Sequence, residues 1–121
     1  MSAHEQPSGL FKTLMHPARL EILEILRNGE ECVCHMEAAL GYRQAYISQQ
    51  LSVLREARLV QDRRDGWNIF YRVVQPQVYD VIDAARALTG EAPARRQMTR
   101  PATLTNCSCP RCSPAESTVP A

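Results

Sequence analysis

Residues 32–60 of the 121-residue chain read CVCHMEAALGYRQAYISQQLSVLREARLV. The first part predicts a short helix over residues 33–40, which Gly41 ends because glycine readily takes the left-handed conformation found at helix ends. A second helix is predicted over residues 44–57, where three apolar residues recur at helical spacing as a buried stripe. They are Ile47, Leu51 and Leu54. Two helices joined by one tight turn are typical of a helix-turn-helix.

The segments on either side complete the fold prediction. Pro17 suits the first turn of a helix that is apolar on nearly all sides and therefore belongs to the core, and a shorter helix is predicted before it, over residues 10–15. The runs VQDRR and IFYRVV flank the turn DGWN, a pattern that predicts a β-hairpin. A last helix is predicted over residues 76–88. We therefore predict a mainly α fold with a β-hairpin wing, a winged helix-turn-helix.

The length of the chain predicts a single domain, which we place at residues 8–90. Residues 91–121 are rich in Pro, Ala, Ser and Thr without periodicity, and this composition predicts a flexible tail. The N-terminus does not resemble a signal peptide, and no apolar run approaches the ~18 residues of a membrane span. We expect a cytoplasmic protein without a membrane partner. In that reducing compartment, clustered cysteines favour metal binding or redox chemistry over structural disulfides.

Charge is unevenly distributed although the net charge is only +1. Residues 43–72 carry six arginines against three carboxylates, whereas residues 1–42 are acidic on balance. On charge alone, an ordinary solvated surface is the favoured interpretation. The order of the elements, a helix-turn-helix followed by a wing, instead favours duplex DNA as a partner. Arginine can bind phosphate or guanine, glutamine can read adenine, and serine can bind phosphate or a base. The candidate DNA contacts are Arg43, Gln44, Ala45, Tyr46, Ser48, Gln49, Arg63 and Arg64.

Two cysteines mark a candidate thiol site at the start of the predicted 33–40 helix. With Cys32 before the first turn and Cys34 inside it, the two sulfur atoms could converge on one ion. The helix N-terminus favours the thiolate form, although Glu30 and Glu31 oppose it. Burial as small apolar residues is the usual fate of lone cysteines, and a redox pair is a further alternative. Two thiols in a polar, acidic stretch favour a metal site.

The tail offers further sulfur ligands, because two thiols are too few for arsenic or for a tetrahedral soft metal. Cys107, Cys109 and Cys112 fall within six residues. The linker over residues 91–106 spans roughly 20 to 24 Å if flexible, against a radius of gyration of about 12 Å for the folded part. The tail can therefore reach the first two cysteines in its own or a partner subunit. The alternative interpretation is that the cysteine cluster of the tail is incidental and binds no ion.

Enzymatic activity is not expected. The Cys-x-x-Cys spacing at residues 109–112 is that of thiol oxidoreductases, but it lies outside any predicted strand-to-helix context. We find no hydrolase triad, phosphate-binding loop or zinc-protease motif in the sequence.

Three blocks in the same order resemble the ArsR/SmtB family of metal-responsive winged-helix repressors. They are FKTLMHPARLEILEILRNGEECVCHM (11–36), QAYISQQLSVLREARLV (44–60) and RRDGWNIFYRV (63–73). The resemblance implies a homodimer, joined through its first and last helices, that binds operator DNA and releases it when a metal or metalloid binds. Cys32 and Cys34 match the cysteines of the family motif Glu-Leu-Cys-Val-Cys-Asp.

The chain also departs from the family pattern. Glu37 stands where arsenic sensors often have a further cysteine, and His35 replaces the aspartate of the motif. In the second helix of the helix-turn-helix, which reads the DNA, the family usually has two adjacent histidines. This chain has Gln49 and Gln50 at those positions. The last helix has aspartates but no histidine, which disfavours the family's zinc or nickel site there.

The function that these features predict is a repressor released by a thiophilic ion that binds cysteine thiolates. Arsenite or antimonite is the first expected effector, cadmium or lead the second, and zinc a further option. The candidate ligands are Cys32, Cys34, Cys107, Cys109 and Cys112. One alternative is a redox- or persulfide-sensing repressor on the same fold. The other is a thiol-rich metal buffer without a DNA role.

Overall fold

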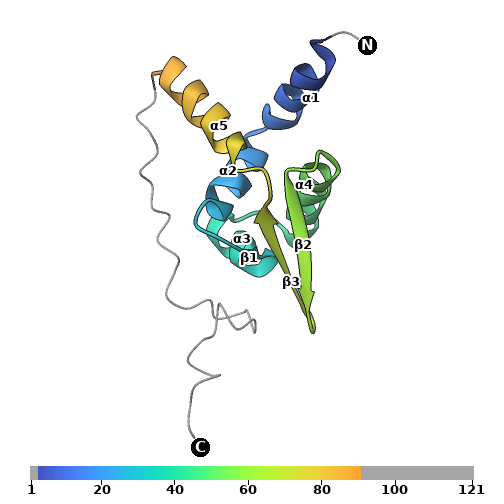
Figure 1. Cartoon of the computed structure of the whole chain (residues 1–121). Coiled ribbons are helices and arrows are strands. Elements are labelled where there is room, and N and C mark those ends of the chain that lie inside the picture. Colours follow the sequence, from blue (N-terminus) through green and yellow to red (C-terminus); the bar gives the residue numbers. More distant parts are fainter. Residues whose placement is uncertain (1–2, 91–121) are drawn as a thin grey trace, which may run out of the picture.

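The structure, a computed structural model, describes residues 3–90, and Figure 1 shows how the elements are arranged. In chain order these are α1 (Glu5–Leu14), α2 (Pro17–Leu26), β1 (Glu31–Cys32), α3 (Val33–Leu40), α4 (Gln44–Glu56), β2 (Val60–Asp65), β3 (Asn68–Val73) and α5 (Gln77–Leu88). The predicted mainly α fold with a β-hairpin wing is confirmed. The predicted tail, residues 91–121, lies outside the described residues.

The core forms where α2, α3 and α4 pack together. Helix α2 begins at Pro17, as predicted, and its Ile22 and Leu23 are fully buried. The predicted stripe of α4 is also fully buried, so burial of its apolar side fixes which side of α4 faces solvent. The largest fully buried side chains are Phe70, Ile22, Leu23, Met36, Ile47, Leu51, Leu54 and Val60.

A short connection joins α3 to α4. Gly41 follows α3 with a φ of 75°, and its backbone N–H donates to the carbonyl of Glu37 over 2.9 Å. Arg43 is extended and precedes the first residue of α4. A residue with a Cβ is strained at a φ of 75°, so glycine allows the sharp turn that sets α4 against α3.

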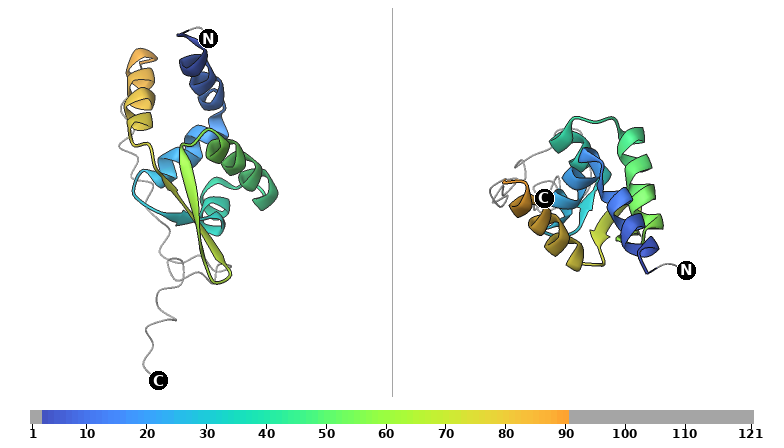
Figure 2. Two further views of the ribbon diagram at one scale, coloured as in Figure 1. Left: turned by 45° about the vertical axis from the view of Figure 1, so that its right-hand side comes forward. Right: turned by 90° about the horizontal axis from the view of Figure 1, so that it is seen from above.

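The sheet has three antiparallel strands in the order β1-β3-β2. Strands β2 and β3 pair from Val60–Val73 to Asp65–Asn68 and form the predicted hairpin, with a turn at residues 66–67. Strand β1 was not predicted: Glu31 pairs with Tyr71, and Cys32 pairs with Phe70. The hairpin extends from the helical body, whereas α1 and α5 extend from its opposite side (Figures 1 and 2).

Helix α1 begins at Glu5, earlier than the predicted start near residue 10. Its apolar side and that of α5 line a groove of about 730 Å³. Among the described residues, no helix has the length and apolar character needed to cross a membrane.

Candidate nucleic-acid interface and thiol site

The N-terminal part of α4 presents the side chains predicted to contact DNA. Each of the six candidates there is exposed, while Ile47 between them is buried. They are Arg43, Gln44, Ala45, Tyr46, Ser48 and Gln49. The helix is therefore anchored through one side and leaves guanidinium, amide and hydroxyl groups on the other, which are the groups that bind phosphates and base edges.

Polar contacts from α2 hold α4 and the turn before it. Arg19 Nε donates to Gln50 Oε1 over 2.8 Å, and the Tyr42 hydroxyl donates to Glu21 Oε1 over 3.0 Å. The hydrogen bond to Glu21 raises the pKa of Tyr42, because the carboxylate favours the protonated phenol. These contacts are on the α2 side, so they restrain α4 without covering its exposed residues.

The two wing arginines differ in their surroundings. The Arg64 side chain is exposed, and among residues 3–90 it makes no ion pair or hydrogen bond. Arg63 Nε donates to both carboxylate oxygens of Glu30, over 3.0 and 3.2 Å, and its guanidinium lies 4.9 Å from the Phe70 ring centroid. The hydrogen bonds to Glu30 raise the pKa of Arg63. The expected phosphate contact by Arg63 therefore has a competitor within the protein.

The two motif cysteines lie where the sequence placed them, at the start of α3. Cys32 is the residue before the first turn, and only 2% of it is exposed because it also belongs to β1. Cys34 lies in the first turn and is partly buried. Cys34 is disulfide-bonded and Cys32 is not part of a disulfide, so the two are not joined to each other.

The surroundings of the cysteines are more buried than an acidic sequence suggests. Glu31 and His35, which flank the pair, are both buried. Within residues 3–90, no group of three or more His, Cys, Asp or Glu side chains is placed to hold a metal ion. The described part of the chain thus supplies the two motif sulfur atoms, one of them in a disulfide. The other candidate ligands, Cys107, Cys109 and Cys112, lie outside the described residues.

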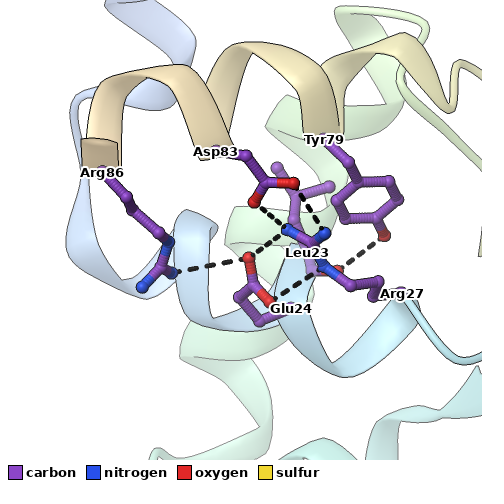
Figure 3. Close-up of polar contacts among 6 residues, drawn as sticks. All are labelled: Leu23, Glu24, Arg27, Tyr79, Asp83 and Arg86. Carbon is purple, nitrogen blue, oxygen red and sulfur yellow. Dashed lines mark hydrogen bonds and ion pairs between the residues drawn. The ribbon is translucent and has the colours of Figure 1, made fainter. Parts of the chain in front are cut away.

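A network of charged side chains joins α2 to α5, and Figure 3 shows Arg27 at its centre. Arg27 donates to both carboxylate oxygens of Asp83, over 2.8 and 3.0 Å, and to both of Glu24, over 2.8 and 3.1 Å. Its guanidinium also lies 4.5 Å from the Tyr79 ring centroid. The Arg27 hydrogen bonds lower the pKa of Asp83. Asp83, one of the two aspartates of α5 with Asp80, therefore serves as an ion-pair partner.

An exposed helix held against α2 and α3, followed by a β-hairpin wing, defines a winged helix-turn-helix DNA-binding protein. Residues 16–62 match the model of the family described as bacterial regulatory protein, arsR family. The chain belongs to this family, whose members are DNA-binding transcriptional regulators and not enzymes. Family membership disfavours the metal-buffer alternative.

Two similar regulators and one solved structure support this family assignment. The chain is 47% identical to the biofilm growth-associated repressor of Agrobacterium fabrum, over 65% of this chain and 68% of that one. It is 38% identical to the arsenic resistance transcriptional regulator ArsR1 of Pseudomonas putida, over 81% of this chain and 75% of that one. It resembles the homodimeric winged helix-turn-helix DNA-binding domain of Mb0332 from Mycobacterium bovis, with a TM-score of 0.64 and 26% identity. The likeness covers 74% of this chain and 88% of that one.

Proposed function

We propose that this chain represses transcription by binding operator DNA as a homodimer and is released when a thiophilic ion binds its cysteine thiolates. Arsenite or antimonite is the first candidate, cadmium or lead the second, and zinc a further option. The observation that carries the proposal is the position of Cys32 and Cys34 at the start of α3, the helix that packs against α4. An ion bound there acts directly on the support of the reading helix.

The DNA-binding part of the proposal depends on α4 and the wing. Gln44 and Gln49 carry the paired donor and acceptor that read adenine in the major groove, and Arg43 and Ser48 can bind phosphate or a base edge. Arg64 is exposed on the hairpin and suits a phosphate contact. Because the hairpin extends beyond the helical body, it can reach DNA next to the segment that α4 occupies (Figure 2).

The sensing part needs sulfur from outside the described residues. Trivalent arsenic is held by three thiolates, and Cys32 and Cys34 at the start of α3 supply two once the disulfide at Cys34 is reduced. We propose that Cys107, Cys109 and Cys112 supply the remainder, from the same or the partner subunit. A short flexible tether gives these thiols an effective concentration on the order of mM, which tightens binding without new folded contacts. The arsenic resistance role of the Pseudomonas putida relative favours arsenite as the first effector to test.

The dimer is supported by the groove between α1 and α5. Apolar side chains dominate its lining, and three of them are exposed at 58, 69 and 89%. They are Phe11, Met15 and Leu88. Large apolar side chains grouped on one surface mark an interaction site, and the homodimeric relative from Mycobacterium bovis favours a second copy of this chain as the occupant. A dimer would present two α4 helices to an operator with two half-sites.

Release follows if binding of the ion moves α3. Helix α3 packs on α4, so a shift at its N-terminus alters the distance between the two reading helices of a dimer. Allosteric coupling of about 1 to 3 kcal/mol lowers DNA affinity by roughly 5- to 150-fold.

The test is a titration of the full chain on a duplex from the promoter of its own gene, read by fluorescence anisotropy. Arsenite, antimonite, cadmium, lead and zinc are added separately under reducing conditions. We expect arsenite or antimonite to release DNA at the lowest concentration. A protein that binds no DNA, or that binds it equally with every ion, contradicts the proposal.

A second candidate function is redox or persulfide sensing, and the disulfide at Cys34 favours it. In that case an oxidant forms a sulfur–sulfur bond at Cys34 and the bond replaces the metal as the signal. The discriminating arm adds hydrogen peroxide or a polysulfide without metal. Release by the oxidant, reversal by dithiothreitol and no response to any ion would establish the alternative.

A further inference from the structure

A direct structural route leads from the thiol site to the wing. Cys32 on β1 pairs with Phe70 on β3, and Phe70 in turn pairs with Arg63 on β2, so the three residues form one row across the sheet. Glu30 is the residue before β1, and its carboxylate binds the Arg63 side chain at the far end of that row. The segment that contains Cys32 therefore also contains the partner of a wing arginine.

The contact between Glu30 and Arg63 occupies one edge of the guanidinium. Nε and Nη2 both donate to the carboxylate, while Nη1 lies 3.9 Å from Asp65. The ring of Phe70 covers one side of the same guanidinium. The Glu30 side chain is 20% exposed and that of Arg63 51% exposed, so the arginine is accessible to DNA but already neutralised.

We propose that Glu30 is an autoinhibitory positioning residue that withholds Arg63 from the DNA backbone. Arginine binds phosphate best through two parallel N–H groups, and the Glu30 carboxylate uses one such pair. A phosphate near Arg63 must displace this carboxylate or remain close to its negative charge. The inference rests on the proposed DNA-binding function and adds an internal competitor to it.

The short β1 strand connects this competitor to the sensor. Glu30 and Cys32 are two residues apart, and β1 consists of residues 31 and 32 alone. An ion that moves Cys32 therefore also moves the Glu30 backbone relative to the wing. Binding at the thiol site strengthens the hold of Glu30 on Arg63, so a DNA phosphate displaces the Glu30 carboxylate less readily.

The primary test compares Glu30→Gln with wild type in the full chain, on a 30-base-pair duplex of the promoter and on one of unrelated sequence. Loss of the competing charge should tighten binding to both duplexes by about 1.4- to fivefold, the range measured for exposed charge pairs. The slope of log affinity against log salt should steepen by about one unit, as expected for one additional phosphate contact.

Three further variants make the result specific. Glu56→Gln removes the same charge at an exposed position of α4 and should behave as wild type. Glu30→Asp keeps the carboxylate, so its affinity for DNA should lie close to that of wild type and below that of Glu30→Gln. In the Arg63→Gln background, Glu30→Gln should have no effect, because the residue that it restrains is gone. Thermal melting followed by circular dichroism confirms that each variant is folded.

The proposal is wrong if Glu30→Gln weakens DNA binding, matches Glu56→Gln, or has the same effect with and without Arg63. An arsenite arm tests the connection to the sensor: release of DNA should be smaller in Glu30→Gln than in wild type, and equal release contradicts the connection. If wild type does not respond to arsenite, the proposed effector is wrong, while the comparison with Arg63→Gln still decides whether Glu30 restrains the wing.

Discussion

Two adjacent glutamines in α4 show how position decides the role of a residue. Gln49 is exposed on the predicted DNA-contact surface, whereas Gln50 is partly buried and accepts a hydrogen bond from Arg19 Nε. The family motif places a histidine at both positions, and the sequence alone does not separate the two glutamines. The structure leaves the Gln49 side chain exposed and uses Gln50 to hold α4 on α2.

Arg64 provides a residue-level prediction. Arg64→Ala should weaken binding to all duplex sequences by a similar factor and lower the salt slope by about one unit, because phosphate contacts do not depend on sequence. Lys12→Ala is the matched control, since it removes one positive charge from α1, on the side opposite the hairpin (Figure 1). Anisotropy titrations at several salt concentrations measure both quantities. An unchanged slope in Arg64→Ala would exclude Arg64 from the interface.

The sequence predicts residue roles best where they depend on local periodicity. The exposed candidates of α4 follow from its buried stripe, and the structure confirms both. The contact between Glu30 and Arg63 joins positions 33 apart, so no local pattern indicates it. The burial of Glu31 and His35 was missed for the same reason, since it depends on how the whole chain folds.

At the level of elements, the helices and the hairpin were predicted because each has its own repeating pattern or turn signal. Strand β1 was not, because two residues cannot show alternation and their pairing with β3 depends on a distant segment. The early start of α1 at Glu5 was also missed, because its first turn contains few apolar residues. These omissions matter, since β1 places Cys32 in the sheet.

The attachment of α5 to α2 predicts a dependence of stability on pH. Arg27 lowers the pKa of Asp83 in the folded state below the ordinary value of 3.8, so the ion pair stabilises the fold above about pH 4. This contribution is lost as the pH falls through the lowered pKa. At pH 7, Asp83→Asn should reduce the free energy of unfolding by about 0.2 to 1 kcal/mol, because both side chains are partly exposed.

Urea unfolding of Asp83→Asn and wild type at a series of pH values checks this prediction. The two proteins should differ at pH 7 and converge as the pH falls below 3.8, where protonation of Asp83 removes the same interaction in wild type. Asp80→Asn is the control, since this exposed residue of α5 makes no ion pair among residues 3–90. A difference that persists unchanged at acidic pH would show that Asp83 acts by something other than its charge.

At the level of the whole molecule, the candidate DNA surface and the candidate dimer surface lie on different parts of the fold. The hairpin extends to one side, and α1 and α5, which line the apolar groove, extend to the other (Figures 1 and 2). The Arg27 network fixes α5 to α2, which packs on α4. The position of α5 in a dimer can therefore influence where α4 lies.

The groove predicts that Leu88 belongs to the dimer contact. Leu88→Glu places a charge in the apolar groove and should shift the protein to monomer in sedimentation velocity experiments at micromolar concentration. Operator affinity should fall by about a hundredfold or more, because two linked reading helices bind more tightly than one. Ala87→Glu is the matched control: Ala87 is exposed on the same helix but does not line the groove. A Leu88→Glu protein that remains dimeric would place the interface elsewhere.

The central claim, that binding at Cys32 and Cys34 releases DNA, is tested most directly by anisotropy of a preformed complex with promoter DNA under reducing conditions. Arsenite is added to wild type and to the Cys32→Ser, Cys34→Ser double variant. We predict that both proteins bind the duplex with similar affinity, because the cysteines lie outside the α4 surface, and that only wild type releases it. Release of DNA from the double variant by arsenite, at the concentration that acts on wild type, would contradict the account.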